Sequence, residues 1–153
     1  MRAKKNAGTL SDVTKFREYL RQRGLRATAQ RIAVHEAMLD LVHAGAEQVC
    51  EHIERHSQTR VTVASVYNIL SDLSDAGVYS RRLTSGSRMC FDLVAAPHLH
   101  LYDSRSGEFR DIPDDGLLEM VEGILRKKRF PGYKVDSVEI QIVCHPTRKS
   151  RQR

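Results

Sequence analysis

Apolar side chains in the first half of the chain recur every three or four residues, which is the spacing of one helix face. The pattern predicts four helices in series. The first ends at Gly24, and the second runs over residues 28–42 with Thr28 as its N-cap. The apolar residues that mark the first, third and fourth helices are Val13, Phe16 and Leu20; Ala46, Val49, Cys50 and Ile53; and Val63, Val66, Tyr67, Leu70 and Leu73.

After Gly77 the repeat changes from 3.6 to two residues, as expected where helix gives way to strand. Residues 88–93 alternate between apolar and polar or small side chains. Residues 84–87 form a turn that can pair this strand with residues 78–83. Helices followed by a two-stranded hairpin are the order of a winged helix-turn-helix domain, and the recognition helix is predicted over residues 62–75.

A second unit follows the hairpin. Residues 98–102, 108–112 and 138–144 show strand alternation, and residues 117–125 show a helical period. A unit this small cannot bury all its apolar faces alone, which favours a symmetric dimer. The predicted fold class is therefore α+β, with a winged helix-turn-helix DNA-binding domain over 1–93, a hinge over 94–97, and a small α/β dimerisation domain with a basic C-terminal tail over 98–153.

The net charge of +6 is unevenly distributed. Residues 1–31 hold nine Lys or Arg against two Asp or Glu, and residues 126–153 hold the same numbers. The middle, residues 32–125, is acidic, with seven basic and fifteen acidic side chains. Basic ends suit a protein that binds DNA, because phosphate neutralisation supplies most non-specific affinity. Two solvated basic tails that serve only solubility are the alternative.

Three cysteines, an odd number far apart in sequence, argue against a secreted disulfide framework. The chain has no apolar run of about 18 residues that could span a membrane. The basic N-terminal segment also lacks the apolar stretch of an export signal. We therefore expect a cytoplasmic protein with no membrane partner.

Five side chains with hard donor atoms form a candidate metal-binding set: His43, Asp92, His98, His100 and Asp111. Three imidazoles and two carboxylates, with no thiolate, suit Fe²⁺ or Mn²⁺ better than softer ions. The ordinary alternatives are a helix-capping role for the first histidine and plain polar strand positions for the other two. Of the remaining histidines, His145 is unassigned, and the three interpreted as polar residues on helix surfaces are His35, His52 and His56.

The apolar stripe of the recognition helix leaves Thr62, Ser65 and Asn68 on its outer face, where such helices meet base edges. The hairpin carries three arginines that can meet backbone phosphate, namely Arg81, Arg82 and Arg88. Each of these residues alone could belong to an ordinary solvated surface. Together with the basic N-terminal segment, they favour DNA binding.

Five motifs in order make the chain similar to the ferric uptake regulator (Fur) family. They are GLRATAQR at 24–31, HAGAE at 43–47, TVASVYNIL at 62–70, FDL at 91–93 and HLH at 98–100. The resemblance runs from about residue 12 to residue 144. It implies a dimeric winged-helix repressor of an operator in double-stranded DNA, not an enzyme. In that family a metal near the hinge sets the angle between the two domains.

Within the family, the spacing of the donors most resembles the peroxide-sensing branch, PerR. The resemblance implies that His43, Asp92, His98, His100 and Asp111 hold one regulatory Fe²⁺ or Mn²⁺. It also implies that peroxide oxidises His43 or His98 when iron is bound. For DNA, it implies a thymine contact by Tyr67 and a minor-groove or phosphate contact by Arg26. Arg31, for phosphate, and Asn68 are further candidates.

The chain departs from the family at the structural zinc site. Most relatives hold zinc with two CxxC pairs, but residues 103–106 are Asp-Ser-Arg-Ser here and Cys144 stands alone. We therefore predict no structural zinc and interpret the cysteines as packing residues. The Irr branch, which responds to iron and haem, shows the same loss, so an Irr-like regulator is the main alternative. A non-haem iron enzyme and a metal-independent DNA-binding protein with vestigial ligands are the other hypotheses.

Overall fold

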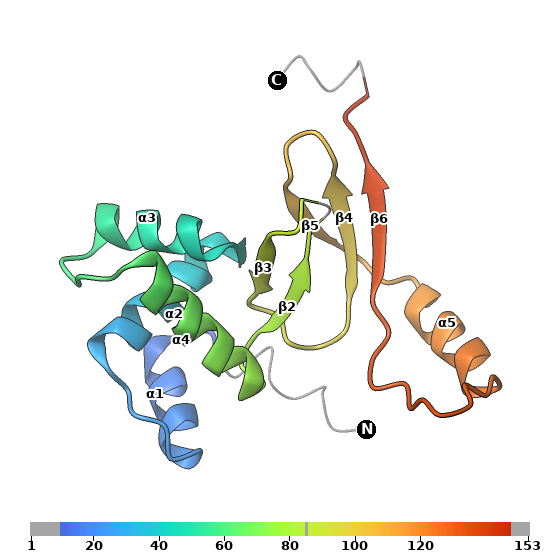
Figure 1. Ribbon diagram of the computed structural model, residues 1–153, viewed down its shortest axis with the longest axis horizontal. Coiled ribbons are helices and arrows are strands. Elements are labelled where there is room, and N and C mark those ends of the chain that lie inside the picture. The colour runs from blue at the N-terminus through green and yellow to red at the C-terminus, as the bar shows by residue number, and fades with distance from the viewer. Residues whose placement is uncertain (1–9, 85, 148–153) are drawn as a thin grey trace. The chain divides into compact units, whose positions relative to one another are not determined.

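The computed structural model describes residues 10–84 and 86–147, which fall into two compact units divided between Ala96 and Pro97 (Figure 1). The N-terminal unit contains α1 (Val13–Gln22), α2 (Ala29–Leu41), β1 (His43–Ala44), α3 (Ala46–His56), α4 (Val63–Asp75), β2 (Ser80–Leu83) and β3 (Met89–Asp92). The C-terminal unit contains β4 (Leu99–Asp103), β5 (Phe109–Ile112), α5 (Leu117–Arg126) and β6 (Ile140–Cys144). Each predicted helix and strand is present, and the α+β class is confirmed. Among the described residues, β1 is the one element that the pattern did not predict.

Local capping explains where the helices begin and end. The Asp12 side chain accepts a hydrogen bond from the Lys15 backbone N–H at 2.9 Å and starts α1. Thr28 does the same for α2, accepting from the Arg31 N–H at 3.2 Å. Gly24, with φ of +67°, adopts the left-handed conformation that commonly terminates a helix, and it follows α1.

The four helices of the N-terminal unit enclose one hydrophobic core. Its fully buried apolar side chains come from every helix and from β3: Phe16, Leu20, Val34, Met38, Val49, Ile53, Val66, Leu70, Leu73 and Phe91. Val63, which the apolar stripe of the fourth helix assigns to the core, is 44% exposed. It occupies the first turn of α4, beyond the edge of the core.

A three-stranded antiparallel sheet, in the order β1-β3-β2, closes the N-terminal unit. Val42 turns the chain from α2 into β1 with φ of +61°, an unusual value for a β-branched residue. Two backbone hydrogen bonds hold it there. Its N–H donates to the Met38 carbonyl, and its own carbonyl accepts from the Leu93 N–H, each at 2.9 Å. This turn places His43 directly opposite Asp92 in the sheet.

His35 is not on a helix surface, and the sequence interpretation of it is wrong. Its side chain is fully buried and stacks on Phe16, with ring centroids 3.9 Å apart. Nε2 lies 3.0 Å from the Leu10 carbonyl, which can only accept, so Nδ1 accepts from the Tyr79 hydroxyl at 2.8 Å. Helical periodicity could not reveal these partners, because they come from other segments. His56 is exposed and His52 partly exposed, as predicted.

The C-terminal unit contains a mixed sheet in the order β5-β4-β6. β4 pairs antiparallel with β5 and parallel with β6. A parallel pair needs a crossover connection, and the segment containing α5 supplies it. The central strand β4 carries the best-buried side chains of the unit, Leu99, His100 and Tyr102.

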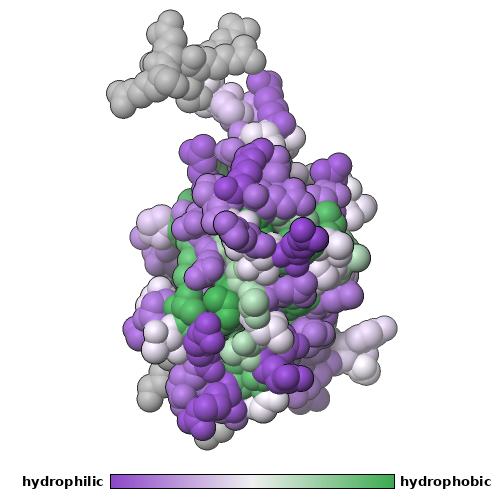
Figure 2. All heavy atoms as spheres, turned by 90° about the vertical axis from the view of Figure 1, so that its left-hand side faces the viewer, coloured by the Kyte–Doolittle hydropathy of each residue, from purple (hydrophilic) through white to green (hydrophobic). Residues whose placement is uncertain are grey.

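The two units differ in how well they bury their apolar side chains. Seen from the side of α1 and α3, the N-terminal unit is largely hydrophilic (Figure 2). Every residue of α5, by contrast, is at least partly exposed. The large hydrophobic residues exposed in the C-terminal unit are Met120, Ile124, Phe130, Tyr133, Val135, Ile142 and Val143. Such a surface is typical of a subunit interface. Among the described residues, no helix combines the length and apolar content needed to cross a membrane.

Candidate functional site

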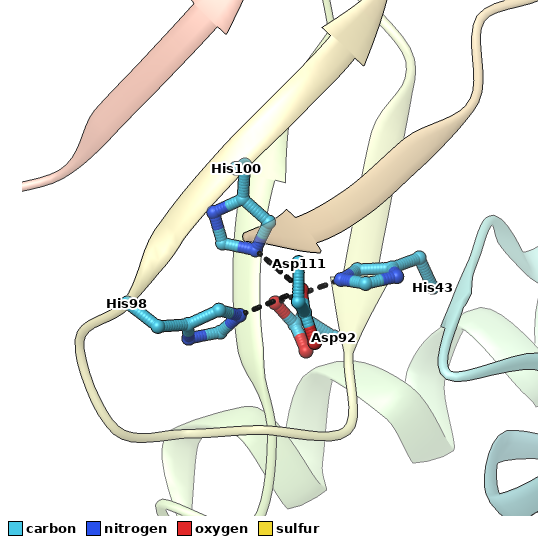
Figure 3. A group of neighbouring side chains, drawn as sticks. All are labelled: His43, Asp92, His98, His100 and Asp111. Carbon is cyan, nitrogen blue, oxygen red and sulfur yellow. Dashed lines mark hydrogen bonds and ion pairs between the residues drawn. The ribbon is translucent and has the colours of Figure 1, made fainter. Parts of the chain in front are cut away.

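The five predicted metal ligands divide between the two units. His43 and Asp92 belong to the N-terminal unit, whereas His98, His100 and Asp111 belong to the C-terminal unit. Each unit therefore carries its own cluster of nitrogen and oxygen donors (Figure 3).

In the N-terminal unit, the pairing of β1 with β3 brings His43 against Asp92. Nε2 of His43 lies 3.4 Å from Oδ2 of Asp92. The Asp92 side chain is fully buried, and its other oxygen accepts a hydrogen bond from the Val94 N–H at 2.8 Å. That bond fixes the carboxylate and directs Oδ2 toward the imidazole. A buried carboxylate beside an imidazole can supply two ligands to one hard cation.

Arg82 lies against the same carboxylate and is nearly buried, whereas the sequence predicted that it meets backbone phosphate. Its Nη2 is 3.2 Å from Oδ2 of Asp92, and its side chain is only 8% exposed. In the β2–β3 pair, Arg82 is opposite Cys90 and Ser80 is opposite Asp92. Arg82 is thus the diagonal neighbour of Asp92 on one face of the hairpin, within reach of a long side chain. Strand alternation in the sequence already places Arg82 and Asp92 on the same face of the hairpin, but the sequence prediction did not pair them.

In the C-terminal unit, two imidazoles converge on one carboxylate oxygen. Oδ1 of Asp111 is 3.1 Å from Nε2 of His98 and 3.5 Å from Nε2 of His100 (Figure 3). His100 and Asp111 are cross-strand partners in the β4–β5 pair. Strand alternation puts His98 on the same face as His100, with ring centroids 4.1 Å apart. Phe109 packs edge-on against the His100 ring and fixes its position.

The donors of both clusters fit a hard divalent cation. Two imidazole nitrogens and a carboxylate oxygen within 4.8 Å of one another in the C-terminal unit match the two-histidine, one-carboxylate arrangement of iron sites. This arrangement leaves coordination positions open. The His43 and Asp92 donors are of the same hard type, and the five contain no sulfur. The carboxylate oxygens of Asp92 and Asp111 also suit Mn²⁺.

Hydrogen bonds hold the β4–β5 turn, where residues 103–106 are Asp-Ser-Arg-Ser. Oδ1 of Asp103 accepts from the Arg105 N–H at 2.8 Å. The N–H and the hydroxyl of Ser104 both donate to the Cys144 carbonyl, at 2.9 and 3.0 Å. These contacts fasten the end of β6 to the turn.

The cysteines have the environments of packing residues. Cys50 and Cys90 are buried, and Cys144 is partly buried. Burial raises the pKa of the Cys90 thiol to about 11 and also raises that of Cys50. A thiol with a raised pKa is a poor nucleophile at neutral pH, because the thiolate is the reactive form.

Two of the predicted DNA contacts, Thr62 and Ser65, form the N-terminal cap of α4. The Thr62 hydroxyl accepts from the Ser65 N–H at 3.1 Å, and the Ser65 hydroxyl accepts from the Thr62 N–H at 2.9 Å. This reciprocal cap sets the start of the predicted recognition helix. Asn68 is exposed, and Tyr67 is 42% exposed with its ring edge-on to Phe91. Thr62, Tyr67 and Asn68 are therefore the exposed candidates, and the Thr62 hydroxyl is engaged in the cap.

Arg26 and Arg31 have different environments. The Arg31 side chain is 19% exposed, with Nη2 3.5 Å from Asp72 on α4. Its Nη1 donates to the Arg26 carbonyl at 2.9 Å. Arg31 thus ties the segment before α2 to α4, whereas Arg26 is exposed. Arg26 is the freer of the two to meet a phosphate.

Four helices with a β2–β3 wing, followed by an α/β unit rich in imidazole and carboxylate donors, define the class of metal-responsive winged-helix regulators. The profile described as Ferric uptake regulator family matches residues 22–143. The chain therefore belongs to the ferric uptake regulator family. Members of this family are metal-responsive, DNA-binding transcriptional regulators that act as dimers, not enzymes.

Individual relatives agree with this assignment. The peroxide operon regulator of Bacillus subtilis (strain 168) is 27% identical over 135 residues, covering 86% of this chain and 90% of the relative. The solved structure of the Vibrio cholerae ferric uptake regulator matches with a TM-score of 0.70 and 22% identity, over 86% of this chain and 99% of that chain. The Pseudomonas aeruginosa ferric uptake regulator, solved with manganese, matches with a TM-score of 0.67 and 24% identity, over 86% of this chain and 97% of that chain. The two solved structures share the fold.

Proposed function

We propose that this protein is a peroxide-sensing repressor that holds one Fe²⁺ or Mn²⁺ with His43, Asp92, His98, His100 and Asp111. The observation that carries the proposal is that each unit gathers hard donors, with His98 and His100 converging on a single Asp111 oxygen in one unit and His43 against Asp92 in the other. Asp92 and His98 are six residues apart, so the chain between them spans at most about 20 Å. Donors from the two units can therefore meet at one ion.

An ion held by both units gives the metal a way to control DNA binding. The ion contacts all five donors in only one arrangement of the units. It therefore stabilises that arrangement over the others, which is the condition for shifting a conformational equilibrium. Residues 94–97 serve as the hinge in this proposal. The metal-bound arrangement is the one in which the dimer binds its operator.

Peroxide sensing assigns a further role to two of the ligands. Bound Fe²⁺ supplies the redox chemistry that activates peroxide, and Mn²⁺ in the same site does not do so readily. We infer that His43 and His98 are the side chains that gain oxygen. An oxidised imidazole is a poorer ligand, so the site weakens and the operator is released. The similarity to the Bacillus subtilis peroxide operon regulator supports this branch of the family.

On DNA, α4 is the proposed recognition helix. Tyr67 and Asn68 are the proposed base contacts, and Arg26 is the proposed minor-groove or phosphate contact. Thr62 and Ser65 start the helix at the DNA surface, and Arg31 holds it in place. A homodimer formed through the exposed apolar surface of the C-terminal unit presents two such helices to a two-fold symmetric operator. A repressor of this kind acts in the cytoplasm.

DNA affinity tests the proposal. Duplexes selected from a random pool by the Mn²⁺-loaded protein serve as the probe in fluorescence anisotropy. We expect tight binding with Mn²⁺, weak binding with chelator, and loss of binding after Fe²⁺ plus peroxide. Asp111→Asn should lose the Mn²⁺ dependence, whereas Glu108→Gln, the same charge change on the neighbouring turn, should keep it. Equal affinity with and without metal contradicts the proposal.

The second candidate is an Irr-like regulator that responds to iron or haem. The observation that favours it is the hydrogen-bonded Asp103–Ser104 turn, which lacks the CxxC pair that the family resemblance implies. A haem titration distinguishes the haem-responsive regulator from the peroxide sensor. A Soret shift at one haem per chain, with loss of DNA binding, supports the haem response. If haem causes no spectral change, the haem response is excluded and the peroxide sensor remains the proposed function.

A further inference from the structure

The carboxylate oxygen that Asp92 offers to a metal already has a cationic partner. Oδ2 lies 3.2 Å from Nη2 of Arg82 and 3.4 Å from Nε2 of His43. The other oxygen accepts from the Val94 N–H. Asp92 is fully buried and Arg82 nearly so, so this is a charge pair removed from water.

A metal ion and Arg82 cannot both keep their contact with this oxygen at low cost. A divalent ion bound between His43 and Asp92 would sit within a few ångströms of the guanidinium, where like charges repel strongly because little water screens them. Either the guanidinium leaves Oδ2 or the ion binds weakly. In both cases the metal must replace an existing favourable pair.

We propose that Arg82 is a built-in competitor of the regulatory metal, which occupies Oδ2 of Asp92 in the metal-free protein and is displaced when the ion binds. This inference rests on the proposed function, because it takes Asp92 as a ligand. Arg82 neutralises the buried carboxylate while no ion is present, so the metal-free fold is stable. It also lowers the affinity of the site, so that the ion binds only above a set concentration.

Arg81, the preceding residue on β2, provides a matched control. Its side chain is 42% exposed and pairs with Asp75, 3.0 Å away, on the other face of the hairpin. Arg81→Gln and Arg82→Gln make the same change in net charge one residue apart. Only the second removes the competitor from Asp92. A general effect of charge would alter both variants alike.

The first test titrates Mn²⁺ into the full-length metal-free proteins and follows the free ion by electron paramagnetic resonance. Arg82→Gln should bind Mn²⁺ at least about tenfold more tightly than the wild type, a change of the size that neighbours of ligands produce. Arg81→Gln should stay within about twofold, because screened surface charges have small effects. Unchanged or weaker binding by Arg82→Gln, or an equal gain in Arg81→Gln, overturns the inference.

A second measurement keeps the inference testable if Arg82→Gln does not fold without metal. In wild-type protein with ¹⁵N-labelled arginine, the Arg82 Nε–H resonance is identified by its absence from Arg82→Lys. One equivalent of Zn²⁺, a diamagnetic probe, should speed its exchange with water, because the guanidinium leaves its buried pair. An unchanged exchange rate in metal-bound protein contradicts displacement.

The outcomes also separate this inference from the proposed function. If Asp92→Asn binds Mn²⁺ as tightly as the wild type, Asp92 is not a ligand, and both proposals fail. If Asp92→Asn loses Mn²⁺ while Arg82→Gln behaves as the wild type, the metal site stands and only the competitor role of Arg82 fails.

Discussion

His43 and Asp92 are direct cross-strand partners, with Nε2 of the histidine 3.4 Å from Oδ2 of the aspartate, although they are 49 positions apart in the sequence. Backbone pairing of β1 with β3 creates this relationship. The N-terminal part of the proposed site is therefore formed by the fold of its own unit. The same holds for the C-terminal part, where β4–β5 pairing sets His100 against Asp111.

The proposal that the donors of both units hold one shared ion predicts the metal stoichiometry. We expect one Mn²⁺ per chain by isothermal titration calorimetry. Asp92→Asn and Asp111→Asn should each weaken that single site by at least about tenfold, because each removes a ligand of the same ion. Two independent sites would give a different result: each variant would abolish one binding event and leave the other intact.

The different environments of Arg26 and Arg31 predict different defects. Arg26→Ala should weaken binding to all duplexes and lower the slope of log affinity against log salt by about 1, with normal stability. Arg31→Ala should lower the free energy of unfolding, because it removes the contacts to Asp72 and to the Arg26 carbonyl. Salt-dependent anisotropy and urea unfolding measure the two effects. A reversed pattern contradicts the assignment.

Buried His35 predicts a loss of stability in acid. Burial lowers the pKa of His35 from 6.5 to about 4, so the unfolded chain takes up a proton between these values and the folded chain does not. The contribution of neutral His35 to the free energy of unfolding is therefore complete above pH 6.5, and it is lost as the pH falls toward 4. The size of the loss is about 3 kcal/mol. Urea unfolding of the metal-free protein at pH 7, 5.5 and 4 measures it.

His35→Gln is the control for this pH effect, since an amide can keep hydrogen bonds to Tyr79 and the Leu10 carbonyl but does not titrate. Between pH 7 and pH 4, the free energy of unfolding of the wild type should fall by about 3 kcal/mol more than that of His35→Gln. Parallel pH curves for the two proteins would show that His35 is not responsible.

The β4–β5 turn predicts a protein that does not depend on zinc. Purified protein should contain no stoichiometric zinc by elemental analysis, and dialysis against chelator should leave its unfolding temperature in metal-free buffer unchanged. Ser104→Ala should reduce the free energy of unfolding by about 1 kcal/mol, because the hydroxyl bond to the Cys144 carbonyl is lost. Ser137→Ala, an exposed serine in the same unit, should have little effect. Bound zinc at one per chain would contradict this prediction.

Periodicity was sufficient for the regular elements of this chain. The helical repeats of α1, α3 and α4 each reflect one buried face, so they are visible in the sequence. Alternation also marked β5 and β6, although neither strand has a buried side chain in this structure. Thr28 and Thr62 marked helix starts because capping is a local interaction. The five candidate ligands came from donor chemistry together with family resemblance.

What could not be predicted depends on tertiary contacts. β1 has only two residues, too few to show a period, and exists because β3 pairs with it. His35 is buried by partners from Leu10 and Tyr79. Arg82 was predicted to meet backbone phosphate with the other arginines of the hairpin, yet a buried carboxylate on the adjacent strand holds it inside. For β1 and His35 the deciding residues lie far away in sequence, whereas for Arg82 the deciding carboxylate is ten residues away on the paired strand.

The central claim is that His43 and His98 belong to an iron site that reacts with peroxide. Peptide mass spectrometry after loading with Fe²⁺ and one brief exposure to hydrogen peroxide tests it most directly. The account predicts a gain of one oxygen, about 16 Da, on His43 or His98, and none on the surface residues His52 and His56. Protein loaded with Mn²⁺ should remain unmodified. Iron-loaded protein that binds its metal but shows no oxygen on either His43 or His98 would contradict the account.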